Sequence, residues 1–167
     1  MNDRQRFEHL IRARHPLITI VTSEENDALS LVRDTALALR KNLQIWSVVG
    51  GIRDGLIADG EPAPATEHPA AALYFLLCQA EPGIAVMLDL AGHLKDEKTL
   101  RLLRDLIQRY RQADGRLILI DHRAEIPSVI AAEGIRFDLS LPDEAELDLI
   151  IRNTLRRLHQ EQRIDID

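Results

Sequence analysis

Short apolar runs alternate with amphipathic segments along most of the chain. The apolar runs predict strands, and the segments between them repeat apolar residues at the three- and four-residue spacing of a helix. The predicted strands are residues 17–21, 44–49, 84–88, 117–120 and 137–141. The predicted helices are residues 4–14, 24–41, 69–80 and 96–112, a short one near Pro127, and 143–160. This alternation predicts an α/β fold: a three-layer αβα sandwich around a five-stranded, mainly parallel sheet.

Two segments add detail to this pattern. Residues 52–68 are rich in Gly, Pro and Ala, which predicts a surface loop between two elements of one domain. The last predicted helix carries apolar residues at helical spacing, and we expect this face to point inward. Its members are Leu147, Ile150, Ile151, Leu155 and Leu158.

The composition excludes several classes of protein. A chain of 167 residues with 46% hydrophobic and 29% charged residues fits one globular domain. The net charge of −6 argues against a nucleic-acid partner, which usually meets a basic face. We expect no membrane partner, because no apolar stretch is long enough to cross a bilayer. With Cys78 as the only cysteine and no signal peptide, we expect a cytoplasmic protein.

The carboxyl ends of the strands are where an open parallel sheet binds ligands. A phosphate-binding loop there needs glycines, a Lys and a hydroxyl, but the segment after the first strand has neither Gly nor Lys. Thr22 and Glu25 instead fit a capping box, with Ser23 as a competing cap. The carboxylates of Glu24, Glu25 and Asp27 would satisfy the helix dipole and repel a polyphosphate. We therefore expect this end to be closed to phosphate.

The third and fourth predicted strands each end in an aspartate. Asp89 follows an apolar strand, as in a Walker B segment, whose Asp helps to hold magnesium. Leu90 stands where ATPases with a Walker B segment commonly carry a catalytic Glu. Asp121, with His93 and His122 nearby in sequence, completes a set that could bind a divalent metal. Strand-end aspartates commonly form caps and turns, so we expect no metal and no catalytic residue here.

Seven short stretches carry a resemblance to a known family. They are residues 10–18, 22–25, 46–48, 83–89, 117–120, 125–127 and 139–143. In this order they resemble the N-terminal region of the hypothetical-chloroplast-reading-frame type of AAA+ ATPase of bacteria and plastids. The resemblance covers most of the chain. It implies a degenerate AAA-like domain with the strand order 5-1-4-3-2. No residue of this chain matches a residue that binds ATP in the family.

The resemblance also implies a function. A degenerate module would serve as a non-catalytic, regulatory or assembly domain that needs no cofactor and is not an enzyme by itself. Its implied partners are a catalytic AAA+ module of the same polypeptide, further copies in a homo-oligomer and a client protein. We expect one domain over residues 1–160, with residues 161–167 opening a following segment. The alternatives are a metal-dependent hydrolase that uses Asp89 and Asp121, and an atypical nucleotide-sensing domain.

Overall fold

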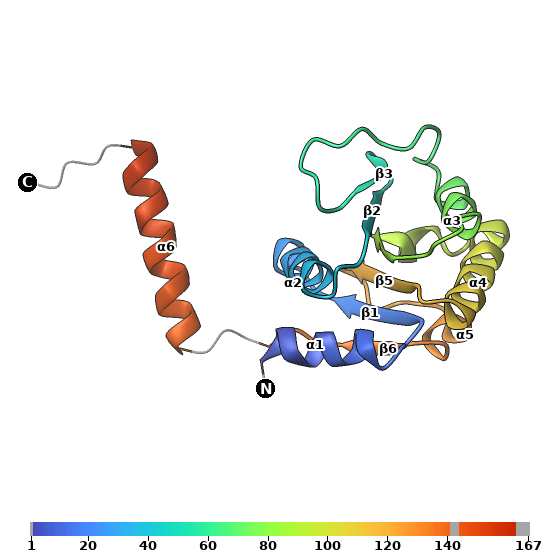
Figure 1. Ribbon diagram of the computed structural model, residues 1–167, viewed down its shortest axis with the longest axis horizontal. Coiled ribbons are helices and arrows are strands. Elements are labelled where there is room, and N and C mark those ends of the chain that lie inside the picture. Colours follow the sequence, from blue (N-terminus) through green and yellow to red (C-terminus); the bar gives the residue numbers. More distant parts are fainter. Residues whose placement is uncertain (1, 141–143, 163–167) are drawn as a thin grey trace, which may run out of the picture.

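The computed structural model describes residues 2–140 and 144–162. Its described strands are β1 (Leu17–Val21), β2 (Leu43–Ser47), β3 (Gly51–Asp54), β4 (Ile84–Leu88), β5 (Arg116–Asp121) and β6 (Ile135–Phe137). The described helices are α1 (Asp3–Arg12), α2 (Glu25–Ala38), α3 (Pro69–Leu77), the 3-10 helix η1 (Leu90–His93), α4 (Glu97–Gln112), α5 (Ser128–Ala131) and α6 (Glu144–Gln162). The sheet lies between two helical layers (Figure 1).

The sheet has the order β3-β2-β4-β5-β1-β6. The five strands expected from the sequence keep their relative order, and all their pairings are parallel. The expected count of five is wrong, because β3 adds a sixth strand that pairs with β2 in an antiparallel hairpin. The sequence signal for β3 is weak because its four residues include Gly51, Arg53 and Asp54, which are rare in strands. An edge strand, exposed along one side, tolerates such residues.

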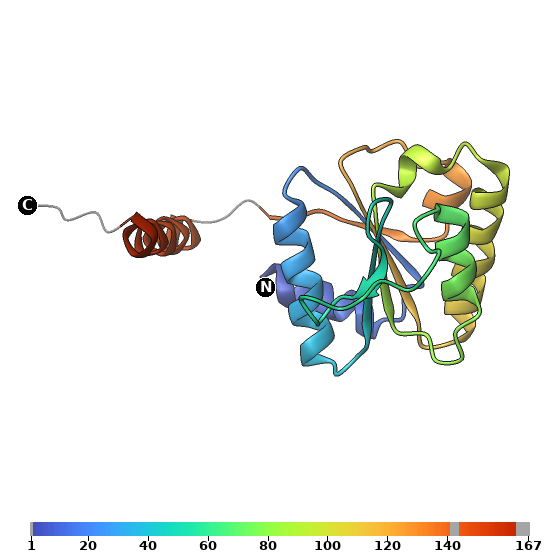
Figure 2. The ribbon, with the colours of Figure 1, turned by 90° about the horizontal axis from the view of Figure 1, so that it is seen from above.

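Each face of the sheet has its own hydrophobic core. Leu117 and Leu119 of β5 pack on the side of α3 and α4, while Ile118 and Ile120 pack on the side of α1 and α2. Alternate side chains of a strand point to opposite faces, so a central strand that is apolar throughout supplies both cores. Figure 2 shows the sheet nearly edge-on between these layers. The resulting frame fixes where the carboxyl ends of the strands lie.

The segment between β3 and α3 is irregular but anchored to the core. Thr66 is buried, and its carbonyl accepts the indole N–H of Trp46 at 2.7 Å. Its hydroxyl accepts the Ile52 amide at 2.8 Å and donates to the carbonyl of Ala63 at 2.7 Å. The expectation of a surface loop over residues 52–68 is therefore wrong at its start, which is strand β3, and at Thr66, which is internal. Trp46 is a core residue, as its strand position predicts.

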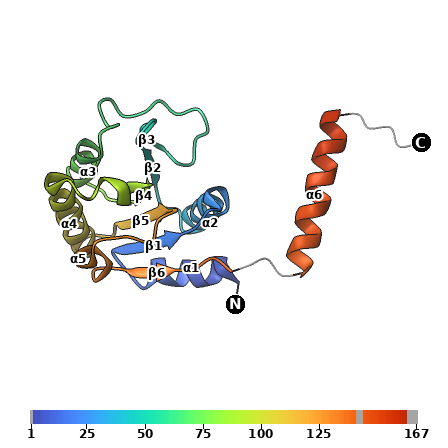
Figure 3. The same ribbon diagram turned by 180° about the vertical axis from the view of Figure 1, so that it is seen from behind.

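The carboxyl-terminal part of the described chain differs most from the expectations. The last strand spans Ile135–Phe137 instead of residues 137–141, and residue 141 lies outside the described residues. Helix α6 stands off the body in opposite views (Figures 1 and 3). The prediction that its apolar face points inward is wrong, because the side chains on this face are exposed. The exposed side chains are Leu147, Ile150, Ile151, Leu155 and Leu158.

No described helix combines the length and the apolar character needed to span a membrane. Residues 163–167, which include most of the expected following segment, lie outside the described part of the chain.

Candidate functional site

An open cavity of about 810 Å³ lies at the carboxyl end of β1. Its wall combines apolar residues with acidic and hydroxyl groups from five segments of the described chain. The lining residues are Asp3, Val21, Thr22, Ser23, Glu24, Asp27, Leu31, His122, Leu139, Ser140, Leu149 and Ile150. The switch point of an open parallel sheet is the usual position of a ligand site, so this cavity is the candidate functional site.

The loop between β1 and α2 forms one side of the cavity without the predicted capping box. The hydroxyl of Thr22 accepts the amide of Glu24 at 2.9 Å, which closes a local turn and keeps the hydroxyl away from the helix. Glu24 occupies the N-cap position with φ −91° and ψ 64°, and its side chain makes no capping hydrogen bond. Neither Thr22 nor Ser23 caps α2. The prediction was wrong because the N-cap of α2 is Glu24, two residues after Thr22.

The start of α2 therefore combines two opposed features. The first amides of a helix have no partner inside the helix, and no described side chain caps those of α2. Such amides and the positive end of the helix dipole favour an anion. The exposed carboxylates of Glu24, Glu25 and Asp27 surround this end and repel one. The geometry of a phosphate site is present here, but the side chains supply charge of the wrong sign.

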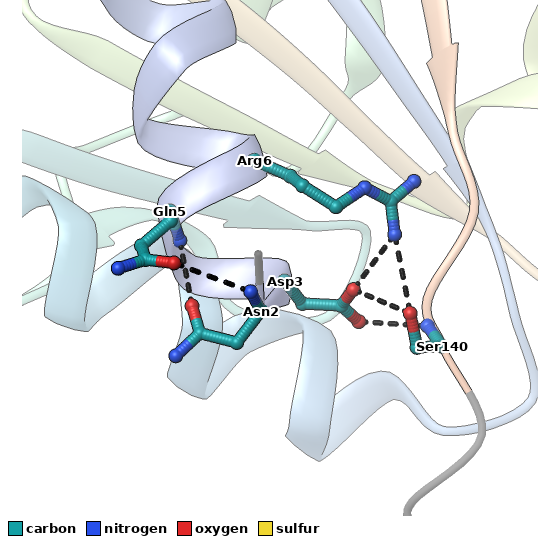
Figure 4. Close-up of polar contacts among 5 residues, drawn as sticks. All are labelled: Asn2, Asp3, Gln5, Arg6 and Ser140. Atoms are coloured by element: carbon teal, nitrogen blue, oxygen red, sulfur yellow. Dashed lines mark hydrogen bonds and ion pairs between the residues drawn. The ribbon is translucent and has the colours of Figure 1, made fainter.

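A polar clamp joins the start of α1 to the segment after β6 beside the cavity (Figure 4). Asp3 accepts the amide of Ser140 at 2.7 Å and its hydroxyl at 2.7 Å. Arg6 donates to Asp3 at 2.9 Å and to the Ser140 hydroxyl at 3.1 Å. Sequence reasoning missed these three residues because partners 137 positions apart leave no local pattern. The clamp fixes the point from which the chain continues toward α6.

Asp121, at the end of β5, is a buried structural carboxylate. Its side chain is 3% exposed, and its two oxygens accept the amides of Ala91 and Arg123, each at 2.8 Å. These bonds hold the start of η1 and the turn after β5 in place. Hydrogen bonds from backbone amides to a charged acceptor are among the stronger ones in proteins. The carboxylate is therefore committed to the backbone.

Asp89 lies across from Asp121 at the end of β4. Its backbone is left-handed, with φ 53°, and its carboxylate lies 2.8 Å from Nδ1 of His122. Nε2 of His122 lies 3.3 Å from Nε of Arg123, which can only donate. Both contacts are satisfied by a neutral imidazole whose proton sits on Nδ1 and points to Asp89. His122 is thus used on both of its ring nitrogens.

The structure brings together three of the four residues that the sequence proposed for a metal. Potential ligand atoms of Asp89, Asp121 and His122 lie within 4.8 Å of one another. His93 is separate, with its ring packed edge-on against Trp46 at 6.2 Å between centroids. Each oxygen of Asp121 already accepts one backbone amide, and both ring nitrogens of His122 have a polar neighbour, so a metal would compete with these contacts. The present donor set therefore fits internal hydrogen bonding better than metal ligation.

Leu90 occupies the position expected for a catalytic Glu and is fully buried in the core beside α3 and α4. A carboxylate at this point would lie among apolar side chains and would pay the full cost of leaving water. Because the side chain of Leu90 points into this core, residue 90 does not line the cavity. Leu90 consequently offers no base toward the candidate site.

Shifted pKa values mark structural contacts elsewhere in the described chain. Hydrogen bonds from the hydroxyl and the amide of Thr99 lower the pKa of Asp96, which caps α4. A hydrogen bond from Lys41 at 2.5 Å lowers the pKa of Asp114 at the opposite edge of the sheet. Burial lowers the pKa of Arg116, which also pairs with Asp114. These groups hold the frame, so their shifts do not point to a second reaction centre.

The fold and the cavity together define an α/β domain with an open cavity at the end of β1, where the loop to α2 contains neither Gly nor Lys. The family model of the SpoVK-like AAA ATPase N-terminal domain matches residues 3–139. The chain therefore belongs to this family of AAA ATPase N-terminal domains. The match supports the AAA+ part of the resemblance and does not confirm the chloroplast-reading-frame type.

Several solved structures share the fold. A DNA replication initiation factor is 14% identical, with a TM-score of 0.59, and the match covers 95% of this chain and 52% of that one. A HORMA:CdnC:Trip13 complex from E. coli MS115-1 gives 9% identity, a TM-score of 0.60, and coverages of 91% and 66%. PCH-2 from C. elegans gives 12% identity and a TM-score of 0.58, and the match covers 94% of this chain and 47% of that one. The chain thus spans about half to two thirds of the solved chains that it matches.

Proposed function

We propose that this chain is a non-hydrolysing regulatory or assembly module of an AAA ATPase. The observation that carries the proposal is the acidic, uncapped start of α2. A phosphate-binding loop would carry glycines and a Lys at this point. Here Glu24 and Asp27 line the cavity instead. Phosphate transfer depends on positive groups that stabilise the developing charge. A site with negative groups at this point lacks that stabilisation.

The ends of β4 and β5 support the same proposal. Hydrolysis needs a residue that orients the attacking water, and in this chain Leu90 stands buried where such a Glu is expected. Two carboxylates on this edge could hold magnesium, and both already have partners in the chain. Asp89 contacts His122, and Asp121 accepts hydrogen bonds from two amides. The second alternative, a metal-dependent hydrolase, loses support for the same reason.

The proposed partners are a catalytic AAA+ module of the same polypeptide, other copies of the protein and a client protein. The hairpin between β2 and β3 supports a role in contacts, because Val49 at its tip is 88% exposed. Ile57, in the loop after β3, is 60% exposed. Apolar side chains that project from loops on a rigid frame are suited to binding another protein. We also propose that this AAA ATPase is of the chloroplast-reading-frame type.

Calorimetric titration with MgATP tests the proposal. We expect no binding heat at micromolar nucleotide and no release of phosphate on long incubation. A dissociation constant near 1 μM, equivalent to about −8.2 kcal/mol, would contradict the proposal. A thermal scan in the same buffers supplies the control, because a ligand at 100 times its dissociation constant adds about 2.7 kcal/mol of stability.

A nucleotide-sensing domain is the second candidate. Two observations favour it: the cavity of about 810 Å³ and the amides at the start of α2, which no described side chain caps. The replication initiator DnaA, which has a similar fold, was solved with AMPPCP and single-stranded DNA. The same titration separates the candidates, since a sensor binds nucleotide without releasing phosphate. Binding with turnover would contradict both.

A further inference from the structure

A second open cavity, of about 510 Å³, lies between α2 and the hairpin of strands β2 and β3. It shares no lining residue with the cavity at the end of β1. Its wall carries two arginines, Arg33 from α2 and Arg53 from β3, in a chain whose net charge is −6. A concavity in which one sign of charge gathers concentrates ions of the opposite sign, so this cavity favours an anionic occupant.

The backbone holds both guanidinium groups of this cavity in place. Nε of Arg33 donates to the carbonyl of Gly55 at 3.0 Å, and Nε of Arg53 donates to the carbonyl of Gly50 at 3.1 Å. Neither arginine has an ion-pair partner within residues 2–140 and 144–162. A guanidinium carries only donors, so the terminal N–H groups of both side chains remain for a partner outside the described chain.

The other polar groups of this cavity add a donor and little acceptor capacity. The hydroxyl oxygen of Ser47 accepts the amide of Gly50 at 3.0 Å, which leaves its O–H to donate. Oδ1 of Asp54 accepts the amides of Leu56 and Ile57 at 2.7 and 3.2 Å, so this carboxylate belongs to the turn after β3. The polar lining therefore matches a group that is negative and only accepts hydrogen bonds, as a carboxylate does.

The remainder of the cavity is apolar. Ile45 and Leu88 are partly buried against the core on the side of α2. Leu56 and Ile57 also line the cavity and are 40% and 60% exposed. A free inorganic anion gains nothing from these four side chains, whereas a polypeptide can bring a carboxylate and apolar side chains to them together. The mixed lining favours an acidic side chain with apolar neighbours.

The main chain of β3 is not available to such a polypeptide at its centre. The amide of Ile52 donates to the hydroxyl of Thr66 at 2.8 Å, and the carbonyl of Ile52 accepts the amide of Ala63 at 2.8 Å. Addition of a further strand needs these two groups. A partner therefore binds at this hairpin through side chains, and the cavity with Arg33 and Arg53 is where they fit.

We propose that this cavity binds an acidic and apolar segment of a partner protein. A carboxylate of the segment pairs with Arg33 and Arg53, and its apolar side chains pack on Leu56 and Ile57. This inference rests on the proposed contact with a client protein and states the chemistry that the client presents. It is independent of the proposed lack of ATP hydrolysis.

Fluorescence anisotropy with a labelled peptide tests the ligand chemistry. The probe is fluorescein-Gly-Leu-Asp-Leu-Asp-Leu-Gly-amide, and the matched peptide has Asn at both Asp positions. We expect the acidic peptide to bind with a dissociation constant below about 1 mM and the Asn peptide to bind at least about tenfold more weakly. Equal affinity, or no binding of the acidic peptide, would overturn the proposal. Displacement by an equal concentration of citrate would show a site for small carboxylates and would overturn it as well.

Two charge-matched double variants test the place of binding. Arg33→Gln with Arg53→Gln removes both guanidinium groups of the cavity. Arg4→Gln with Arg104→Gln removes the same charge from exposed positions that line neither cavity. We expect the first pair to weaken the acidic peptide at least about tenfold and the second less than about twofold. Equal weakening would show attraction by net charge alone and would refute the site.

A matched pair of apolar substitutions tests the other part of the contact. Leu56 in the cavity and Val129 on α5 have similar exposed fractions, 40% and 38%. We expect Leu56→Ser to weaken the acidic peptide at least about threefold and Val129→Ser to leave its affinity unchanged. Equal affinities in the two variants would remove the apolar contact from the proposal. A chain that binds neither this peptide nor MgATP contradicts the present inference alone, whereas a chain that binds both contradicts only the proposed function.

Discussion

We propose that the two halves of the carboxyl edge of the sheet lack phosphate chemistry for different physical reasons. At the end of β1 the backbone leaves helix amides without a described side-chain cap, but Glu24, Glu25 and Asp27 place negative charge around them. At the ends of β4 and β5 the carboxylates are suitable for a cation, but Asp121 is bound to backbone amides. One half has available geometry and unsuitable charge, and the other has suitable carboxylates that already have partners within the chain.

This difference teaches how to interpret a degenerate site. Charge at an exposed helix start can be altered by substitution without loss of the fold, because these side chains are in water and support no core contact. A buried carboxylate that binds two amides is part of the frame, and its removal affects folding before function. We therefore expect the two halves to respond oppositely to substitution.

The largest expected effect is at Asp121. Asp121→Asn turns one acceptor into an amide that faces a backbone N–H, so we expect the free energy of unfolding to fall by about 2–3 kcal/mol. Asp89→Asn is the matched control. It keeps a residue that tolerates the left-handed backbone, and the side chain of Asp89 is 53% exposed. We expect it to cost less than about 1 kcal/mol in urea denaturation. Equal losses would show that the two carboxylates share one role.

A smaller effect distinguishes the start of α4 from that of α2. Asp96 caps α4 and its folded pKa is lowered, mainly by the Thr99 hydroxyl, so its stabilisation is present above the unfolded pKa of 3.8. That stabilisation is lost as the pH falls through the folded pKa. We expect Asp96→Ala to lower Tm by about 2–4 °C near neutral pH. The difference should disappear in the most acidic scans. A difference that persists there would show that the carboxylate charge contributes nothing.

A cap can be added to α2, where none is present. Glu24→Asn supplies a favoured N-cap side chain, and we expect about 0.5–1 kcal/mol of additional stability in thermal and urea unfolding. Glu24→Gln removes the same charge without a good cap and serves as the control. If both variants gain equally, the relief of charge repulsion explains the gain and the missing cap does not.

The smallest expected effect is that of divalent metals. Because Asp121 and His122 are occupied by internal partners, we expect Mn²⁺ and Zn²⁺ at about 100 μM to shift Tm by less than about 1 °C. A His122→Ala variant should show the same small response. A large shift that His122→Ala abolishes would establish a metal centre and contradict the assignment of this half as structural.

The sequence predicts the parallel part of the fold because its strands are continuous apolar runs, which have few alternative positions. It also predicts that Asp89 and Asp121 lie on neighbouring strands. Strand β3 escapes prediction because its pairing comes from a hairpin and not from its own composition. The cap of α2 depends on the torsion angles at Glu24, which a pattern of residue types does not specify. The sequence does not specify whether the apolar face of α6 is buried, because that depends on what packs against the helix.

Neutralising the start of α2 tests the central claim most directly. Glu24→Gln, Glu25→Gln and Asp27→Asn together leave the amides in place and remove three negative charges. Thermal unfolding with increasing phosphate, compared with chloride at equal ionic strength, measures anion binding. We expect phosphate to stabilise the neutralised variant and to leave the wild type unchanged. Equal phosphate stabilisation of both proteins would contradict the claim that the acidic side chains close this site.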